Sequence, residues 1–175
     1  MTKMPRQRPR QEPLIDKTIL AVGLRFFVYL LVFTAALGVV DASGGLQFLM
    51  LMTAKVSTSL ITLTGVKATQ TGTLIYLSNR TLAIDVACTA VYLVALFNAL
   101  ILAYPVKWTS RLLGVLGGTI AIAGVNLGRI VAVAHVSIRA PGSFDFIHDY
   151  LFQVGMTMAV VMIWVLWLKM ARRHA

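Results

Sequence analysis

The stretch VACTAVYLVALFNALILAYPV, residues 86–106, decides the fold because it contains 21 consecutive residues without a charged side chain. A helix needs about 20 apolar residues to cross the hydrocarbon core of a bilayer. The whole chain of 175 residues is 58% hydrophobic and only 13% charged, whereas a soluble domain has about 25% charged residues. The composition therefore excludes a water-soluble globular domain and predicts an all-α polytopic membrane protein.

Four regions of the sequence are apolar enough to cross a membrane. We expect transmembrane helices over residues 18–40, 88–104, 112–135 and 150–169. These four helices form a single membrane domain, residues 18–175, which follows a basic cytoplasmic tail over residues 1–17.

The segment between the first two spans, residues 41–87, is predicted to lie outside the bilayer core. Residues 46–63 place Lys55 and three hydroxyl side chains on one helical face and apolar side chains on the opposite face. This pattern is typical of an amphipathic helix at the membrane interface, with a fifth span as the alternative. Residues 69–86 combine β-favouring residues with a turn signal at 78–80, which predicts a small β-hairpin.

The basic residues give the four predicted spans an orientation. Of the 16 Lys and Arg residues, 10 fall on the side of the two termini, 4 on the other side and 2 within helices. Cytoplasmic loops carry an excess of Lys and Arg, so both termini are predicted to be cytoplasmic. A five-span arrangement splits the charges less clearly. The net charge of +10 thus reflects membrane topology, and no nucleic-acid partner is needed to explain it.

Three residues at the predicted outer ends of the spans have catalytic potential: Cys88, Arg129 and His148. Cys88 is the only cysteine, which excludes an internal disulfide and a multi-cysteine metal site, and we expect no cofactor or metal. At a helix start its thiol would gain thiolate character from the dipole. Arg129 lies within a span, where a charge is costly and commonly functional. The simpler explanations are a buried thiol, an arginine that reaches the headgroups, and an interfacial histidine.

The same three side chains suit the cleavage of a peptide bond. A thiolate attacks the carbonyl carbon, an imidazole transfers the proton, and a guanidinium stabilises the developing oxyanion. Four-helix bundles bring the ends of their helices within reach of one another. We therefore expect the three residues to meet at the outer membrane surface.

Two aspartates and one asparagine are supporting candidates. Asp85 and Asp149 are sequence neighbours of the cysteine and the histidine, and either could orient the base or hold the arginine. Asn126 lies one helical turn before the arginine and shares its face. We expect Asn126 to join helices, with a hydrogen bond to Asn98 of the second span as its partner.

Three blocks of this sequence resemble the exosortase and archaeosortase family. Residues 86–90 (VACTA) are similar to its cysteine block, residues 126–130 (NLGRI) to its Asn-x-x-Arg block, and residues 148–153 (HDYLFQ) to its histidine block. The order and spacing agree over about residues 65–170, and the short chain is most similar to the compact exosortase H type. Ala90 departs from the family pattern, which commonly has glycine there.

The resemblance implies a membrane cysteine protease and transpeptidase at the outer face of the bacterial cytoplasmic membrane. Its partners would be the lipid bilayer and exported proteins whose C-terminal signal combines a short motif, a hydrophobic span and a basic tail. Cys88 would be the nucleophile that forms a thioester, His148 the acid/base and Arg129 the transition-state stabiliser. The acceptor, an amine or a lipid, stays open. The predicted hairpin could add a strand to an extended motif.

Two other functions are compatible with the same residues. A non-enzymatic four-helix membrane assembly or scaffold subunit would use Arg129 and the asparagines only to join helices. A membrane acyltransferase with a surface cysteine would carry a fatty acyl thioester in place of a peptidyl thioester. Replacement of Cys88 distinguishes the first alternative, and the mass of the group on its sulfur distinguishes the second.

Overall fold

The computed structural model describes residues 17–140 and 152–173 of the chain. Its helices are α1 (Lys17–Ala42), α2 (Gly45–Leu63), α3 (Val91–Ala103), α4 (Trp108–Arg139) and α6 (Phe152–Arg173). Three short strands and the 3-10 helix η1 (Val86–Thr89) lie between α2 and α3. The predicted all-α polytopic membrane fold with a small β element is confirmed.

Four of the described helices are long and apolar enough to cross a membrane. They are Lys17–Ala42, Gly45–Leu63, Trp108–Arg139 and Val154–Arg172. Helix α3 is also apolar but has 13 residues, which span about 20 Å at 1.5 Å per residue. The predicted span 88–104 is therefore a short helix preceded by a 3-10 turn, because the chain bends between Thr89 and Val91.

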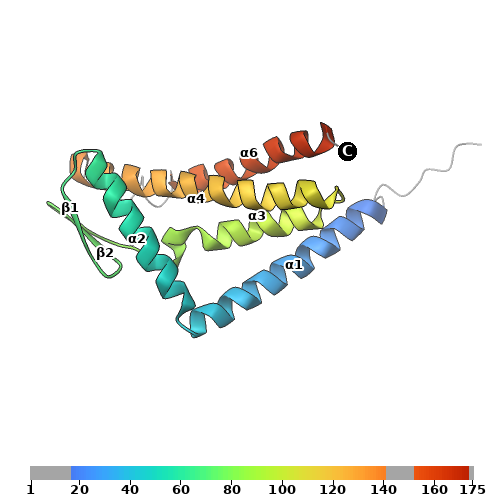
Figure 1. Cartoon of the computed structure of the whole chain (residues 1–175), viewed down its shortest axis with the longest axis horizontal. Helices are drawn as coiled ribbons and strands as arrows, with labels where there is room; N and C mark the ends of the chain where they lie inside the picture. The colour runs from blue at the N-terminus through green and yellow to red at the C-terminus, as the bar shows by residue number, and fades with distance from the viewer. Residues whose placement is uncertain (1–16, 141–151, 174–175) are drawn as a thin grey trace, which may run out of the picture.

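Helix α2 runs obliquely across one end of the bundle, as Figure 1 shows, and packs against η1, α4 and the first strand. A turn at Gly44, whose φ is 75°, separates it from α1. It buries Ala54, Ser57 and Ile61 on one face. Residues 46–63 are thus helical as expected, and their position at the membrane interface stays a prediction.

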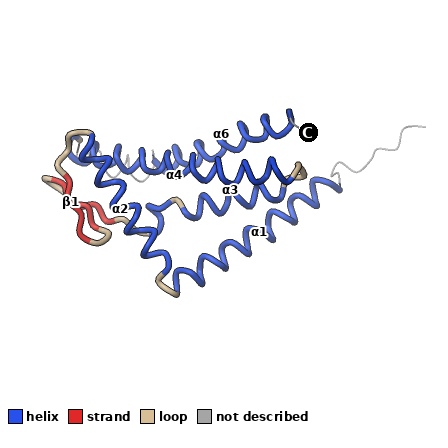
Figure 2. The backbone as a smooth tube through the Cα atoms, viewed as in Figure 1, coloured by secondary structure: helices blue, strands red, loops and turns tan. Residues whose placement is uncertain are grey.

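The predicted hairpin is a three-stranded antiparallel sheet in the order β1 (Ala68–Thr71), β2 (Leu74–Leu77) and β3 (Thr81–Ala83). The first predicted strand divides at Gly72, whose φ of 61° is the left-handed conformation that glycine adopts most readily. The predicted turn at residues 78–80 separates β2 from β3. Figure 2 shows the strands together at the end of the bundle that α2 crosses.

Two clusters of buried apolar side chains meet at η1. One joins α2, the sheet and the C-terminal half of α4, and Cys88 packs against it. The other joins α3, α4 and α6 around Phe97 and Trp167, and it includes Ala90. Cys88 packs in the first cluster and Ala90 in the second. Close packing on both sides therefore fixes this turn between the sheet and the helical bundle.

Candidate functional site

Cys88 lies in a capped 3-10 turn that precedes the helix. Its backbone N–H donates to the Oδ1 atom of Asp85 at 3.0 Å and also approaches the Asp85 carbonyl at 3.1 Å. Asp85 is the N-cap residue of η1, where an aspartate satisfies an otherwise unpaired N–H group. The expectation that Cys88 opens the second long helix is therefore corrected, since α3 begins only at Val91.

Ala90 ends η1 in a left-handed conformation, with φ of 57° and ψ of 14°. It is the one non-glycine residue with positive φ in the described ranges. This conformation costs a residue with a Cβ atom about 1–2 kcal/mol, whereas glycine adopts it freely. The glycine that the resembling family has at this position matches the backbone geometry that Ala90 adopts here.

Asn126 anchors the turn from the neighbouring helix. Its side-chain Nδ2 donates to the carbonyl of Cys88 at 2.6 Å, and the residue is 2% exposed. The predicted bond between Asn98 and Asn126 is wrong, because Asn98 donates instead to the hydroxyl of Thr119 at 3.4 Å. The late start of α3 places a turn carbonyl, rather than a side chain, within reach of Asn126.

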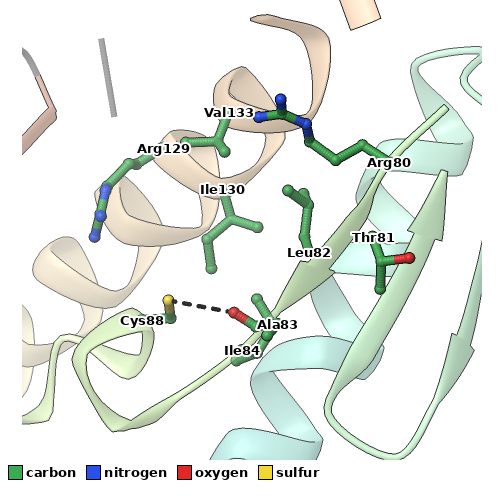
Figure 3. Close-up of a pocket in the computed structure, with 9 residues that line it drawn as sticks. All are labelled: Arg80, Thr81, Leu82, Ala83, Ile84, Cys88, Arg129, Ile130 and Val133. Carbon is green, nitrogen blue, oxygen red and sulfur yellow. Dashed lines mark hydrogen bonds between the residues drawn. The ribbon is translucent and has the colours of Figure 1, made fainter. Parts of the chain in front are cut away.

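A cavity of about 390 Å³ opens between the sheet and α4, and we call it the sheet-side cavity. It is lined by residues 80–84, Cys88, Arg129, Ile130 and Val133. Figure 3 shows Arg80 and Arg129 projecting at opposite ends of the cavity, with Cys88 near the Ala83 carbonyl. The cysteine and arginine of the sequence prediction thus line one cavity.

A second cavity, of about 280 Å³, lies on the other side of Arg129 among α3, α4 and α6, and we call it the helix-side cavity. It is lined by Ala87, Ala90, Tyr92, Leu93, Arg129, Met156 and Thr157. Arg129 therefore borders both cavities. Its Nε atom is buried and has no hydrogen-bond partner within the described residues.

Burial raises the pKa of the Cys88 thiol above its ordinary value. Cys88 lies in η1, outside the helices that are candidates for crossing the membrane. The backbone hydrogen bond at Asp85 opposes this effect, and so does the charge of Arg129, but neither outweighs burial. Burial thus opposes the expected thiolate character, and a four-residue 3-10 turn stands where a long helix with its dipole was expected.

Two predicted site residues, His148 and Asp149, lie outside the described residues. His135 lines neither the sheet-side nor the helix-side cavity, and its Nδ1 atom lies 2.9 Å from the Val131 carbonyl of its own helix. Within residues 17–140 and 152–173, no group of three or more His, Cys, Asp or Glu side chains could hold a metal ion.

Residues 80–84 line the sheet-side cavity, but no pattern in the sequence marks them as part of a site. Thr81 and Ala83 are exposed and alternate with buried Leu82 and Ile84. This alternation is visible in the sequence, but it distinguishes only the two faces of a strand. It contains no information about which edge of the sheet runs toward the cysteine.

The fold and these cavities define a polytopic membrane protein that holds a cysteine and an arginine together at one end of its helical bundle. The model of the transmembrane exosortase family matches residues 17–172, and the chain belongs to that family. No curated protein and no solved structure shows significant similarity to it. Membership indicates a general membrane transpeptidase role in the processing of exported proteins. The predicted family is confirmed, and the H type stays a prediction.

Proposed function

We propose that the protein is a cysteine transpeptidase that cleaves C-terminal sorting signals of exported proteins at the outer face of the bacterial cytoplasmic membrane. The observation that carries this proposal is the sheet-side cavity, in which Cys88 and Arg129 line one space between an exposed strand and a helix. A nucleophile and a cation in a common cavity meet the main requirement of acyl transfer.

The proposed reaction passes through a thioester on Cys88. The thiol gives its proton to the imidazole of His148, and the sulfur bonds to the carbonyl carbon of the substrate. Arg129 stabilises the resulting oxyanion. The carbon–nitrogen bond then breaks, and the imidazolium returns its proton to the leaving amine. An acceptor amine, a lipid hydroxyl or water attacks the thioester, gives up a proton to the imidazole and restores the thiol.

Two hydrogen bonds fix the position of the η1 turn, and this supports Cys88 as the nucleophile. Asp85 binds its N–H and Asn126 binds its carbonyl, so the backbone on both sides of the Cys88 side chain is fixed before substrate arrives. Such preorganisation lowers the barrier of the chemical step. Asp149, the sequence neighbour of His148, is a candidate to orient the imidazole or to hold Arg129.

The arrangement of the ends of the chain supports the proposed orientation. The first residues of α1 and the last residues of α6 lie at one end of the bundle, and the sheet and η1 lie at the other, as Figure 1 shows. The turn between α3 and α4 lies at the end that carries the termini (Figure 1). Lys107 is the last residue of this turn, and Arg111 lies in the first helical turn of α4. By the positive-inside rule this end is cytoplasmic, which directs Cys88 outward.

The test is a processing assay in cells. Exported proteins of the source genome that end in a short motif, an apolar span and a basic tail are co-expressed with the wild-type chain or with variants. We expect Cys88→Ala, Cys88→Ser and His148→Ala to abolish processing and Arg129→Ala to reduce it by at least about a hundredfold. The matched controls His135→Ala and Arg139→Ala should process normally.

Processing that survives Cys88→Ala refutes the proposal and favours the non-enzymatic assembly. Mass spectrometry of the trapped intermediate supplies the second criterion. A peptidyl mass on Cys88 supports the proposed thioester, whereas a fatty acyl mass there refutes it and identifies an acyltransferase.

A further inference from the structure

Strand β3 forms one edge of the sheet, and within the described residues it pairs with β2 alone. The backbone N–H of Leu77 donates to the carbonyl of Arg80 at 2.8 Å, and the N–H of Ile84 donates to the carbonyl of Thr73 at 2.9 Å. Successive residues of a strand direct their backbone groups to alternate sides. The groups of residues 80, 82 and 84 therefore face β2, and those of residues 81 and 83 face away from it.

This free edge leads to the nucleophile. The Sγ atom of Cys88 lies 4.0 Å from the carbonyl oxygen of Ala83, and the dashed line in Figure 3 marks this approach. Thr81 and Ala83 are both exposed, and both line the sheet-side cavity. The outward backbone groups of β3 thus form one wall of the cavity that contains Cys88.

We propose that β3 binds the substrate segment just upstream of the cleaved bond as an added strand, parallel to β3. This inference rests on the proposed function and specifies how that site recognises its peptide. An extended peptide is the occupant whose N–H and C=O groups match those of Thr81 and Ala83. The three residues of β3 cover about 10 Å, so the pairing involves about three substrate residues.

The two cavities determine the direction of the substrate. Beyond Cys88, the helix-side cavity lies against α3, α4 and α6, where Tyr92, Leu93 and Met156 give it apolar walls. The part of the substrate downstream of the cleaved bond continues into its hydrophobic span, which belongs beside membrane helices. The upstream part is therefore left for the sheet-side cavity. Since Cys88 follows β3 in the chain, a substrate that runs toward Cys88 along β3 is parallel to it.

Arg129 borders both cavities. This position is consistent with a substrate that runs from the sheet-side cavity to the helix-side cavity. A peptide that passes from the sheet-side cavity to the helix-side cavity crosses the guanidinium at the point where it passes Cys88. In this arrangement the scissile carbonyl lies between the sulfur and the guanidinium of Arg129.

A proline substitution tests whether the edge is used. Ala83→Pro removes an N–H that faces the cavity and no hydrogen bond of the sheet. Ala68→Pro is the matched control, because the same alternation directs the N–H of this β1 residue away from β2 at the opposite edge. The probe is an exported protein that ends in a short motif, an apolar span and a basic tail, and whose processing requires Cys88. We expect Ala83→Pro to slow its processing at least tenfold and Ala68→Pro less than twofold, at equal amounts of membrane-inserted chain.

Disulfide crosslinking tests the direction independently of turnover. In the Cys88→Ala background the chain has no other cysteine, so T81C, A83C or A68C supplies the single thiol. A second thiol is moved through the six substrate positions before the cleaved bond. A parallel strand predicts that A83C crosslinks nearest the cleaved bond, T81C about two residues further upstream, and A68C not at all.

The reverse order of crosslinks, equal crosslinking by A68C, or no crosslinks from either β3 position overturns the inference. So does an Ala83→Pro variant that processes as well as Ala68→Pro. In each of these cases the proposed function still stands, because it depends on the loss of processing in Cys88→Ala. Processing that is independent of Cys88 would instead remove the proposed function itself.

Discussion

The side-chain amide of Asn126 donates a hydrogen bond of 2.6 Å to the backbone carbonyl of Cys88, which lies 38 residues earlier in the chain. This bond ties the turn that carries the thiol to the helix that carries Arg129. Cys88 and Arg129 are therefore held in register by a residue one helical turn from the arginine. A displacement of either would change the distance between the nucleophile and the oxyanion site.

Replacement of Asn126 should impair turnover more than folding. Asn126→Ala leaves the Cys88 carbonyl without its partner, at a cost of about 1–3 kcal/mol in the free energy of unfolding. Because the thiol loses its fixed position, we expect processing to fall about ten- to a hundredfold. Asn98→Ala is the matched control, since it removes a hydrogen bond between α3 and α4 without touching η1. The two unfolding temperatures and processing rates are compared, and equal loss of processing in both variants contradicts a positioning role.

The thiol of Cys88 should react slowly at neutral pH in the absence of substrate. Its raised pKa means that the thiolate fraction is smaller than that of a free thiol at pH 7 and grows through the alkaline range. We expect labelling by iodoacetamide in detergent to rise about tenfold per pH unit there. The label reports on one residue, because the chain has one cysteine.

Arg129→Ala should make the same labelling slower at any fixed pH in that range. The charge of Arg129 lowers the pKa of Cys88, so its removal raises the pKa further and reduces the thiolate fraction severalfold. Arg139→Ala, an exposed change at the end of α4, is the control. Faster labelling of the Arg129→Ala protein would show that the guanidinium shields the thiol rather than stabilising its anion.

The left-handed backbone at Ala90 predicts opposite effects from small and branched side chains. Ala90→Gly relieves about 1–2 kcal/mol of backbone strain and loses a buried methyl group worth about 0.8 kcal/mol, so the unfolding temperature should stay level or rise. Ala90→Val should lower it by several degrees, because a β-branched residue disfavours positive φ. At Ala95, within α3, the glycine variant should instead destabilise by about 1 kcal/mol. A destabilised Ala90→Gly protein with intact Ala95→Gly stability would contradict the assigned conformation.

Two neighbouring glycines of α4 should respond differently to alanine. A Cβ atom at Gly118 would collide with the ring of Phe97, whereas one at Gly117 meets nothing within 4 Å. Overpacking of this kind costs about 1–3 kcal/mol, so Gly118→Ala should lower the unfolding temperature and Gly117→Ala should leave it unchanged or raise it. Thermal unfolding in detergent measures both, and similar values for the two variants would contradict the packing of α3 on α4.

Several features of the fold and the site could be predicted from residues close together in the sequence. Charge-free windows identified the apolar helices, because the free energy of membrane insertion depends on about 20 consecutive residues. The turn at residues 78–80 and the helix over residues 46–63 follow from equally local patterns. The blocks around Cys88, Arg129 and His148 identified the family, since each block is a short run of residues at a fixed place in the order.

Other features depended on contacts between distant residues. The predicted partner of Asn126 was wrong because α3 begins at Val91, and that start depends on the Asp85 cap and the left-handed Ala90. The burial of Cys88, which opposes thiolate formation, comes from α2, the sheet and α4 together. The free edge of β3 could not be recognised in the sequence. The alternation of residues 81 to 84 shows which side chains share a face of the strand, but it does not show which strands or helices lie beside it.

By itself, the sequence determined that this is a membrane-spanning exosortase with one thiol. Hydrophobicity and motif order depend only on the order of the residues in the chain, and not on how the helices pack. Only the tertiary structure decided that Cys88 and Arg129 share a cavity, that Asn126 fixes the turn, and that the edge of β3 leads to the sulfur. Those relationships depend on the rotation and depth of one helix against another, which are set by close packing of side chains from segments far apart in the chain.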